Sequence, residues 1–198
     1  MKKLLIAAIA VLGFTTANAQ WAPEAGDIQT SISFTPFKSN GRMFDTVGLN
    51  ATYFFDSKNA VRVGVDFSSW TRKDDDVKSS DFTFGFLAGY EYHFKTVDRL
   101  DLFAGGDGFF ETYTSKERGH KVDGGYTAFG FDAFTGLNFY VYKNLYLGAE
   151  LRLRYAHYNY NSYDVEVEDG IWENVDPKSS GNEFDIEALP SLKLGWKF

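Results

Sequence analysis

Apolar and polar residues alternate along most of the chain with a period of two. Near the C-terminus every second residue from Phe184 to Phe198 is apolar, and the residues between them are mostly charged or small. Such alternation is typical of β-strands with one apolar and one polar face, and no segment beyond residue 20 shows the 3.6-residue period of an amphipathic helix. The pattern predicts eight strands, over 28–34, 46–55, 61–68, 82–94, 100–112, 129–139, 145–155 and 184–198.

The connections between these segments alternate between short and long. The second, fourth and sixth segments are followed by the short stretches DSKN, KTVDR and YKN, whereas long polar stretches follow the other segments. Antiparallel strands connected in this way form an up-and-down meander with tight turns at one end and long loops at the other.

Large aromatic side chains mark both ends of the apolar faces, and Val, Leu and Ala fill the strand middles. This arrangement is typical of a barrel whose outer face contacts lipid. The opposite faces are rich in small polar residues, which suits the narrow lumen of eight strands, whereas a soluble lipocalin-like barrel needs its apolar face inside. The expected rings are Tyr53, Phe55, Tyr90, Tyr92, Phe94, Phe139, Trp196 and Phe198 at the short-turn end, and Phe34, Trp70, Phe82, Phe129 and Tyr155 at the long-loop end.

The first residues resemble a cleaved secretion signal. The basic start MKK precedes the apolar run LLIAAIAVLGF, and Ala17 and Ala19 form an A-x-A cleavage site. A membrane anchor helix is the alternative, but the run is short for a helix that spans a bilayer. We therefore expect residues 1–19 to be a cleaved signal peptide and residues 20–198 to form the barrel domain. The chain has no cysteine, so neither a disulfide nor a cysteine-linked lipid can stabilise it or anchor it.

The final strand has to pair with the first one, because an unpaired sheet edge cannot lie in hydrocarbon. The sequence therefore predicts an all-β fold, a closed eight-stranded antiparallel up-and-down transmembrane β-barrel. The acidic balance, a formal net charge of −7, argues against nucleic acid as a partner.

Over the signal peptide and all of residues 20–198 the chain resembles the small eight-stranded outer-membrane β-barrel proteins of Gram-negative bacteria, the OmpA-barrel, OmpX and OmpW type. The residues that carry the resemblance are Leu192, Leu194, Trp196 and Phe198. In that family such an ending is the signal that the barrel-assembly machinery reads. The resemblance implies export through the inner membrane, insertion into the outer membrane, and contact with its lipid and lipopolysaccharide. Pro190 departs from the pattern and predicts a bulge or a missing ladder bond.

Strand parity places a cluster of charges in the lumen, at similar depth on neighbouring strands. One interpretation is a salt-bridged plug that satisfies buried charges, and the other is a gate for small solutes. The filled interior expected of eight strands favours the plug. Within it, Arg62 and Glu91 should lie within salt-bridge reach. The predicted lumen cluster is Arg62, Glu91, Asp107, Asp132, Glu150, Arg152, Arg154 and Glu187.

The sequence holds little that indicates catalysis or a cofactor. The resemblance class includes lipid A deacylases and acyltransferases, which need a histidine with a nearby serine and a carboxylate. His93 has no serine beside it, His120 lies in a charged loop, and Asn159 stands where the deacylase pattern after His157 has a serine. The acidic stretches 73–76 and 164–170 lack the ligand spacing of a calcium loop. We predict no catalytic residue, no cofactor and no metal site.

The predicted function is therefore that of a non-enzymatic outer-membrane barrel with a structural, envelope-integrity or surface-interaction role. The alternative is a narrow, porin-like pore or carrier for small or hydrophobic solutes, and a lipid A-modifying enzyme is the weakest candidate. A surface or periplasmic protein partner is left open. We expect the short turns at Lys58, Val97 and Lys143 on the periplasmic side and the long loops at Asp75, His120 and Asp169 outside.

Overall fold

The computed structural model describes residues 21–34, 47–74, 77–117, 120, 125–168, 171–176, 180–185 and 191–198. Across these ranges the regular structure consists of strands, and none of the described segments is a helix long and apolar enough to cross a membrane. The expected signal peptide, with Ala17 and Ala19, lies outside the described residues, as does Pro190 with the bulge predicted there.

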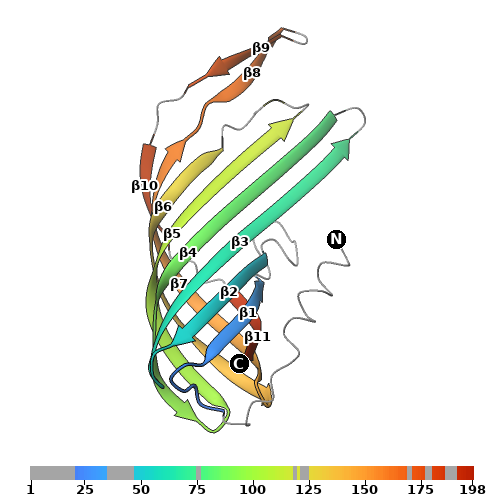
Figure 1. The fold of residues 1–198 in the computed structure, drawn as a ribbon. Helices are drawn as coiled ribbons and strands as arrows, with labels where there is room; N and C mark the ends of the chain where they lie inside the picture. The colour runs from blue at the N-terminus through green and yellow to red at the C-terminus, as the bar shows by residue number, and fades with distance from the viewer. Residues whose placement is uncertain are drawn as a thin grey trace.

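The strands form a closed antiparallel ring (Figure 1). β11 pairs with β1 at one side and with β7 at the other, while β10 pairs with the next stretch of β7. β10 and β11 together therefore occupy the eighth place, and the predicted eight-stranded barrel is confirmed. The ring strands are β1 (Ile28–Phe34), β2 (Val47–Phe54), β3 (Asn59–Asp74), β4 (Val77–Val97), β5 (Leu100–Glu117), β6 (Tyr126–Tyr142), β7 (Leu145–Tyr160), β10 (Ser180–Asp185) and β11 (Ser191–Lys197).

Several strands are much longer than the sequence predicted. β4 has 21 residues and β5 has 18, so that β3, β4 and β5 continue through stretches predicted as long loops. The loop expected between β7 and the last strand contains a hairpin, β8 (Tyr163–Glu168) paired with β9 (Ile171–Val175), which belongs to a separate sheet and rises above the barrel (Figure 1). Beyond the lipid band both faces of a strand are polar, so the alternation that marks a strand disappears there.

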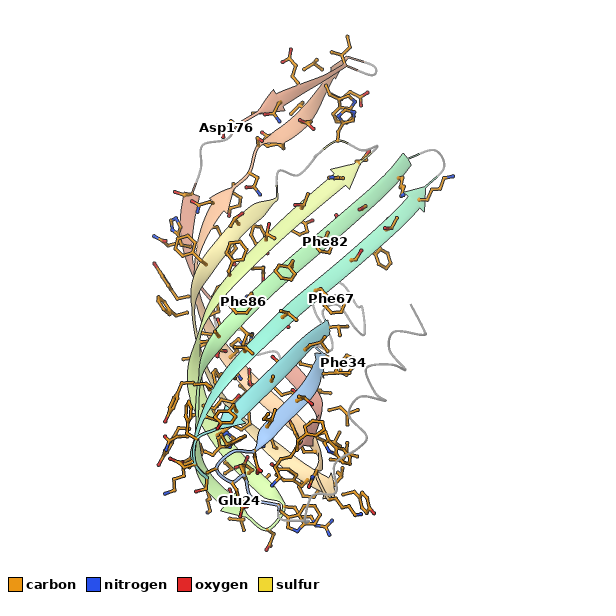
Figure 2. The ribbon with its side chains drawn as sticks, in the orientation of Figure 1. Glu24, Phe34, Phe67, Phe82, Phe86 and Asp176 are labelled. Atoms are coloured by element: carbon orange, nitrogen blue, oxygen red, sulfur yellow. The ribbon has the colours of Figure 1, made fainter. Side chains whose placement is uncertain are left out.

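The outer face carries the predicted aromatic and aliphatic side chains. Phe67, Phe82 and Phe86 project from the long strands (Figure 2), and each is more than two-fifths exposed because no described part of the chain covers them. Trp70 is an exception to the prediction. It pairs with Asp81 on the same face of the sheet as Arg62, so it lies on the inward side of β3 and not in the outer ring.

The inner face holds bulky rings as well as small residues, which corrects the expectation of a lumen lined mainly by small ones. Glycines on neighbouring strands make room for these rings. Gly105, for example, lies against the ring of Phe134, and a Cβ at this glycine would overlap the ring. The buried inward rings are Phe54, Phe103, Phe109, Phe134, Tyr140 and Tyr146.

The segment before β1 closes the short-turn end of the barrel. Pro23 is fully buried, and Lys197 Nζ donates a 2.8 Å hydrogen bond to the carbonyl oxygen of Ala22 and lies 3.2 Å from a carboxylate oxygen of Asp27. At the same end Phe198 N donates to Ile28 O at 2.8 Å, which completes the junction of the last and first strands.

Candidate functional site

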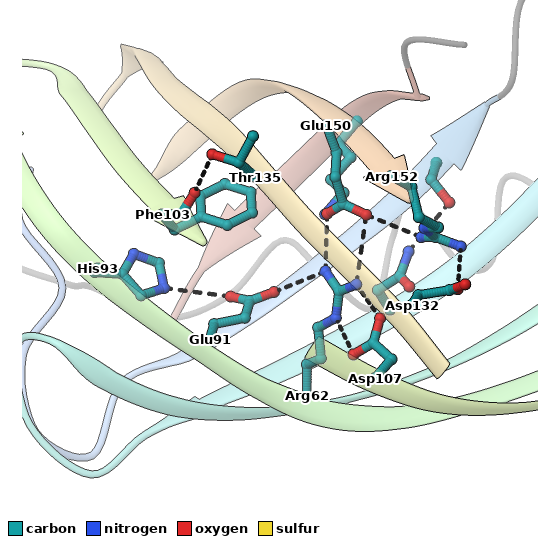
Figure 3. Close-up of polar contacts among 12 residues, drawn as sticks. Arg62, Glu91, His93, Phe103, Asp107, Asp132, Thr135, Glu150 and Arg152 are labelled. Carbon is teal, nitrogen blue, oxygen red and sulfur yellow. Dashed lines mark hydrogen bonds and ion pairs between the residues drawn. The ribbon is translucent and has the colours of Figure 1, made fainter. Parts of the chain in front are cut away.

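A buried arginine lies at the centre of the lumen and contacts carboxylates from three other strands (Figure 3). Arg62 Nε donates to Asp107 Oδ1 at 2.7 Å, and Nη2 contacts the second oxygen of the same carboxylate. Arg62 Nη1 lies 3.1 Å from Glu91 Oε1 and 2.8 Å from Glu150 Oε2. The ion pair predicted between Arg62 and Glu91 is therefore present, and only 3% of the arginine side chain is exposed.

The strand register explains how Arg62 reaches across the sheet. Arg62 on β3 is opposite Gly89 on β4, which is opposite Asp107 on β5. Because Gly89 has no side chain, the guanidinium passes over it to the carboxylate two strands away, and a Cβ at this position would overlap that carboxylate. The spacing of one arginine, one glycine and one aspartate on three strands thus builds the bidentate pair.

Further cations extend the network toward the long-loop end and the last strand. Glu150 accepts hydrogen bonds from Lys193 Nζ at 2.5 Å and from Arg152 Nη2 at 2.9 Å, in addition to Arg62. Arg154 binds both oxygens of Asp132 at 2.9 Å, and its Nη1 lies 3.4 Å from Glu111 Oε2. The result is a chain of ion pairs that joins β3, β4, β5, β6, β7 and β11.

His93 extends the same network toward the short-turn end. Its Nε2 lies 3.2 Å from Glu91 Oε2 and its Nδ1 lies 2.8 Å from Asp101 Oδ2, whose carboxylate also accepts a 3.1 Å bond from Thr96 Oγ1. Both ring nitrogens face carboxylates, so the ring donates to both only as the doubly protonated imidazolium. In that protonated form His93 is a further cation between two acids.

Aromatic rings pack against the charged side chains of the ionic network. The guanidinium carbon of Arg62 lies 3.4 Å from the ring centre of Phe134, and that of Arg154 lies 4.0 Å from the ring centre of Phe109. Toward the long loops, Phe109 packs into an apolar cluster that includes Leu87. Toward the short turns, Tyr140 is fully buried and accepts a hydrogen bond from Gln29 Nε2 at 2.9 Å. Buried aromatic and apolar side chains thus lie on both the long-loop side and the short-turn side of the charges.

The structure brings together seven residues of the predicted cluster, and the eighth, Glu187, lies outside the described residues. The prediction omitted Lys193 and Asp101, although strand parity already placed both inward, and it did not connect His93 with its acids. The alternation of apolar and polar residues did not predict that Phe134 faces the lumen, because an apolar ring on the inward face departs from the pattern of small polar residues there. The seven residues are Arg62, Glu91, Asp107, Asp132, Glu150, Arg152 and Arg154.

The two remaining histidines lie near the long-loop end and contact no serine within the described part of the chain. His157 Nδ1 is 2.5 Å from Asn182 Oδ1, and the ring packs against Phe129. His120 stacks on Trp172, with ring centres 4.3 Å apart and planes 5° from parallel. Over the described ranges no three His, Cys, Asp or Glu side chains are grouped so that they could hold a metal ion.

Comparisons with known proteins place this barrel among outer-membrane proteins. Residues 74–198 match the model of the putative OmpA-OmpF-like porin family. The structure is similar to OprG of Pseudomonas aeruginosa, with 13% sequence identity, a TM-score of 0.53 and coverage of 90% of this chain and 98% of OprG. It is also similar to the E. coli outer membrane protein W, with 12% identity, a TM-score of 0.46 and coverage of 88% and 99%.

Another similar structure is Ail of Yersinia pestis, solved in complex with the heparin analogue sucrose octasulfate, with 11% identity, a TM-score of 0.45 and coverage of 88% and 99%. No curated protein matches the sequence. The family match covers more than half of the chain, and the fold agrees with it. The chain is therefore an outer-membrane β-barrel that belongs to the putative OmpA-OmpF-like porin family.

Proposed function

We propose that this protein is a non-enzymatic barrel with a closed lumen, which supports the envelope and acts through its rims and loops. The observation that carries the proposal is the Arg62 network, in which one buried cation binds three carboxylates on three strands. A porin-like pore is the alternative, since the family name includes porins. A pore requires the charges at the centre of the lumen to move apart, whereas a closed barrel keeps them together.

The geometry makes separation costly. Opening a path means moving Arg62 away from Asp107 and Glu150, whose side chains have no exposed surface. Breaking one buried pair costs about 3–5 kcal/mol because it leaves a charge without a partner. The network thus favours a lumen that is closed nearly all of the time.

Single-channel recordings in planar bilayers test this proposal. The wild-type barrel should show no steady conductance, whereas a variant that removes the central pair, Arg62→Ala with Asp107→Ala, should show short openings. The wild type and the variant must first show the same heat-modifiable mobility on a gel, so that only folded barrels are compared. Steady conductance of the wild type would contradict the closed lumen and support the narrow pore.

The β8–β9 hairpin supports a surface-interaction role. It carries exposed apolar side chains, with Val167 and Ile171 each at least half exposed. A two-stranded hairpin is rarely stable alone in water, and this one is held by the stack of His120 on Trp172. We infer that the hairpin is displayed for a protein partner. Cells with residues 163–176 replaced by a flexible linker should lose attachment to protein-coated surfaces, and unchanged attachment would contradict this role.

Export and orientation complete the proposal. Residues 1–19 would be removed after Ala19, the barrel-assembly machinery would read the last strand, and the short turns would face the periplasm. Outer-membrane lipid and lipopolysaccharide would surround the outer face. Support comes from the signal-like start, the bare apolar outer face and the paired C-terminal strand. Mass spectrometry of the protein from the outer membrane should find Gln20 as the first residue, and an intact Met1 would contradict the cleavage.

A further inference from the structure

A cavity of about 550 Å³ opens at the short-turn rim, beside the turn that joins β4 to β5. It is amphipathic, because a charged turn forms one part of its wall and outward-facing apolar side chains form another. The residues that line it are Trp21, Val97, Asp98, Arg99, Leu100 and Phe139.

Arg99 is held in position by an aromatic ring and a backbone hydrogen bond, without a charged partner among the described residues. Its guanidinium carbon lies 4.7 Å from the ring centre of Trp21, and its carbonyl oxygen accepts a 2.8 Å hydrogen bond from Tyr140 N. In the described part of the chain no carboxylate lies within ion-pair distance of it. A guanidinium placed over an aromatic ring keeps its N–H groups free for a ligand at the edge, and these groups match a phosphate.

Asp98 is the second charge in this wall that has no partner in the described part of the chain. Its φ of 49° places it in the left-handed region of the tight turn. Although it is next to Arg99 in the chain, the two side chains form no ion pair, and within the described ranges the Asp98 carboxylate has no hydrogen-bond donor. The cavity therefore presents one cation and one anion, separately, to whatever occupies it.

The rest of the lining places the cavity at the membrane surface. Leu100 and Phe139 face each other across β5 and β6 on the lipid side, and Val97 at the end of β4 is exposed. Arg99 follows Val97 by two residues, so at about 3.3 Å per residue its backbone lies only a few ångströms beyond the apolar band. That depth is where lipid head groups begin.

We propose that this cavity binds a phospholipid whose head group carries both a phosphate and a primary ammonium, a phosphatidylethanolamine. The phosphate accepts hydrogen bonds from Arg99, the ammonium donates to Asp98, and an acyl chain lies along Leu100 and Phe139. A phosphatidylglycerol head group offers Asp98 only neutral hydroxyl donors, which bind a carboxylate more weakly than an ammonium does, and a choline head group has no N–H to donate to Asp98. The occupied site would fix the short-turn rim at the head-group level.

Native mass spectrometry of the folded barrel in detergent, with added phosphatidylethanolamine, phosphatidylglycerol or phosphatidylcholine, tests the proposal. One phosphatidylethanolamine should bind the wild type at least about 10-fold more tightly than either other lipid. Arg99→Gln should weaken its binding about 10-fold or more, and Asp98→Asn should remove the preference over phosphatidylglycerol. Lys143→Gln is the matched control, because Lys143 also lies near a ring at a turn, 5.4 Å from the centre of Tyr142, but lines no part of this cavity.

Soluble phosphoethanolamine separates the head group from the lipid. It should bind at least about 10-fold more weakly than the lipid, and Phe139→Ala should weaken lipid binding without changing binding of the soluble compound. Equal binding of lipid by wild type and Arg99→Gln would overturn the site. Equal binding of phosphatidylethanolamine and phosphatidylglycerol by the wild type would overturn the assignment of the head group. Heat-modifiable mobility and circular dichroism would confirm that each variant is folded.

Discussion

Replacing Arg62 by methionine tests the central network directly. The change removes the cation while keeping a side chain of similar length, and it leaves three buried carboxylates to find other partners. Two of them retain partners, because Glu150 keeps Lys193 and Arg152, and Glu91 keeps His93. Asp107 is different: among the described residues Arg62 supplies its only hydrogen bonds and ion pair. The loss should therefore come mainly from one stranded carboxylate.

The expected loss in free energy of unfolding follows from the number of carboxylates that are left without a partner, which is one. One buried charge without a partner costs about 3–5 kcal/mol in free energy of unfolding, whereas three independent losses would cost roughly three times as much. We expect Arg62→Met to lower the free energy of unfolding by about 3–5 kcal/mol. Adding Asp107→Asn removes the stranded charge, so the double variant should recover part of the loss and show a coupling energy of at least ~1 kcal/mol.

Urea unfolding in lipid vesicles, followed by tryptophan fluorescence and by gel mobility, measures these differences. Lys73→Met is the matched control, since Lys73 is an exposed cation on the same strand and its replacement should change stability by no more than about 0.5 kcal/mol. A loss below ~1 kcal/mol for Arg62→Met would refute the reasoning, because the carboxylates would then be solvated in the lumen. A double variant less stable than Arg62→Met alone would contradict the assignment to Asp107.

Three further predictions concern the ends of the barrel. Deletion of Phe198, which is partly exposed beside β1, should leave refolding in detergent nearly normal but sharply lower the amount of barrel in the outer membrane on an immunoblot; a normal amount would show that the residue is no assembly signal. A cysteine at Asp169 should be labelled on intact cells and one at Lys58 should not, and the opposite result would reverse the orientation. The Asn59 side chain and the backbone N–H groups of Lys58 and Asn59 donate to Asp56 and hold the pKa of its carboxyl below the ordinary value. The stability that these hydrogen bonds contribute should therefore be present at neutral pH and disappear as the pH falls through that lowered pKa. An NMR titration should show the pKa of Asp56 rising in Asn59→Ala.

The parts of the fold that the sequence predicted are those where the two faces of a strand meet different surroundings. Between lipid and lumen the alternation is enforced, so the ring of strands and the ion pair of Arg62 with Glu91 could be deduced from parity and strand order. Above the lipid band both faces meet water. The upper parts of β3 and β4, which pair as far as Asp74 and Val77, therefore resembled loops in the sequence.

The interior was harder to predict because its composition depends on three-dimensional fit. Phe103 and Phe134 are apolar residues on the polar face, and they fit only because glycines stand beside them on neighbouring strands. Irregular pairing adds to the difficulty, since a bulge between His93 and Lys95 shifts the register of β4 against β5. Neither a ring that fills the space over a glycine nor a bulge leaves a periodic signal in one sequence.

The ionic network and the β8–β9 hairpin are physically independent, and this bears on how the protein can act at the cell surface. The network holds together ring strands that pair over many residues, while the hairpin forms its own sheet and pairs with none of the described ring strands. Substitutions in two regions with no shared partners usually add in their effects on stability. Changes of the exposed apolar residues of the hairpin, Val167 or Ile171, should therefore leave the stability of the ring almost unchanged. A barrel that is stabilised by ion pairs in its lumen can thus carry exposed apolar residues that a soluble domain of marginal stability would tolerate less well. Because exposed apolar residues often mark interaction sites, the hairpin is the place to look for a partner of this protein.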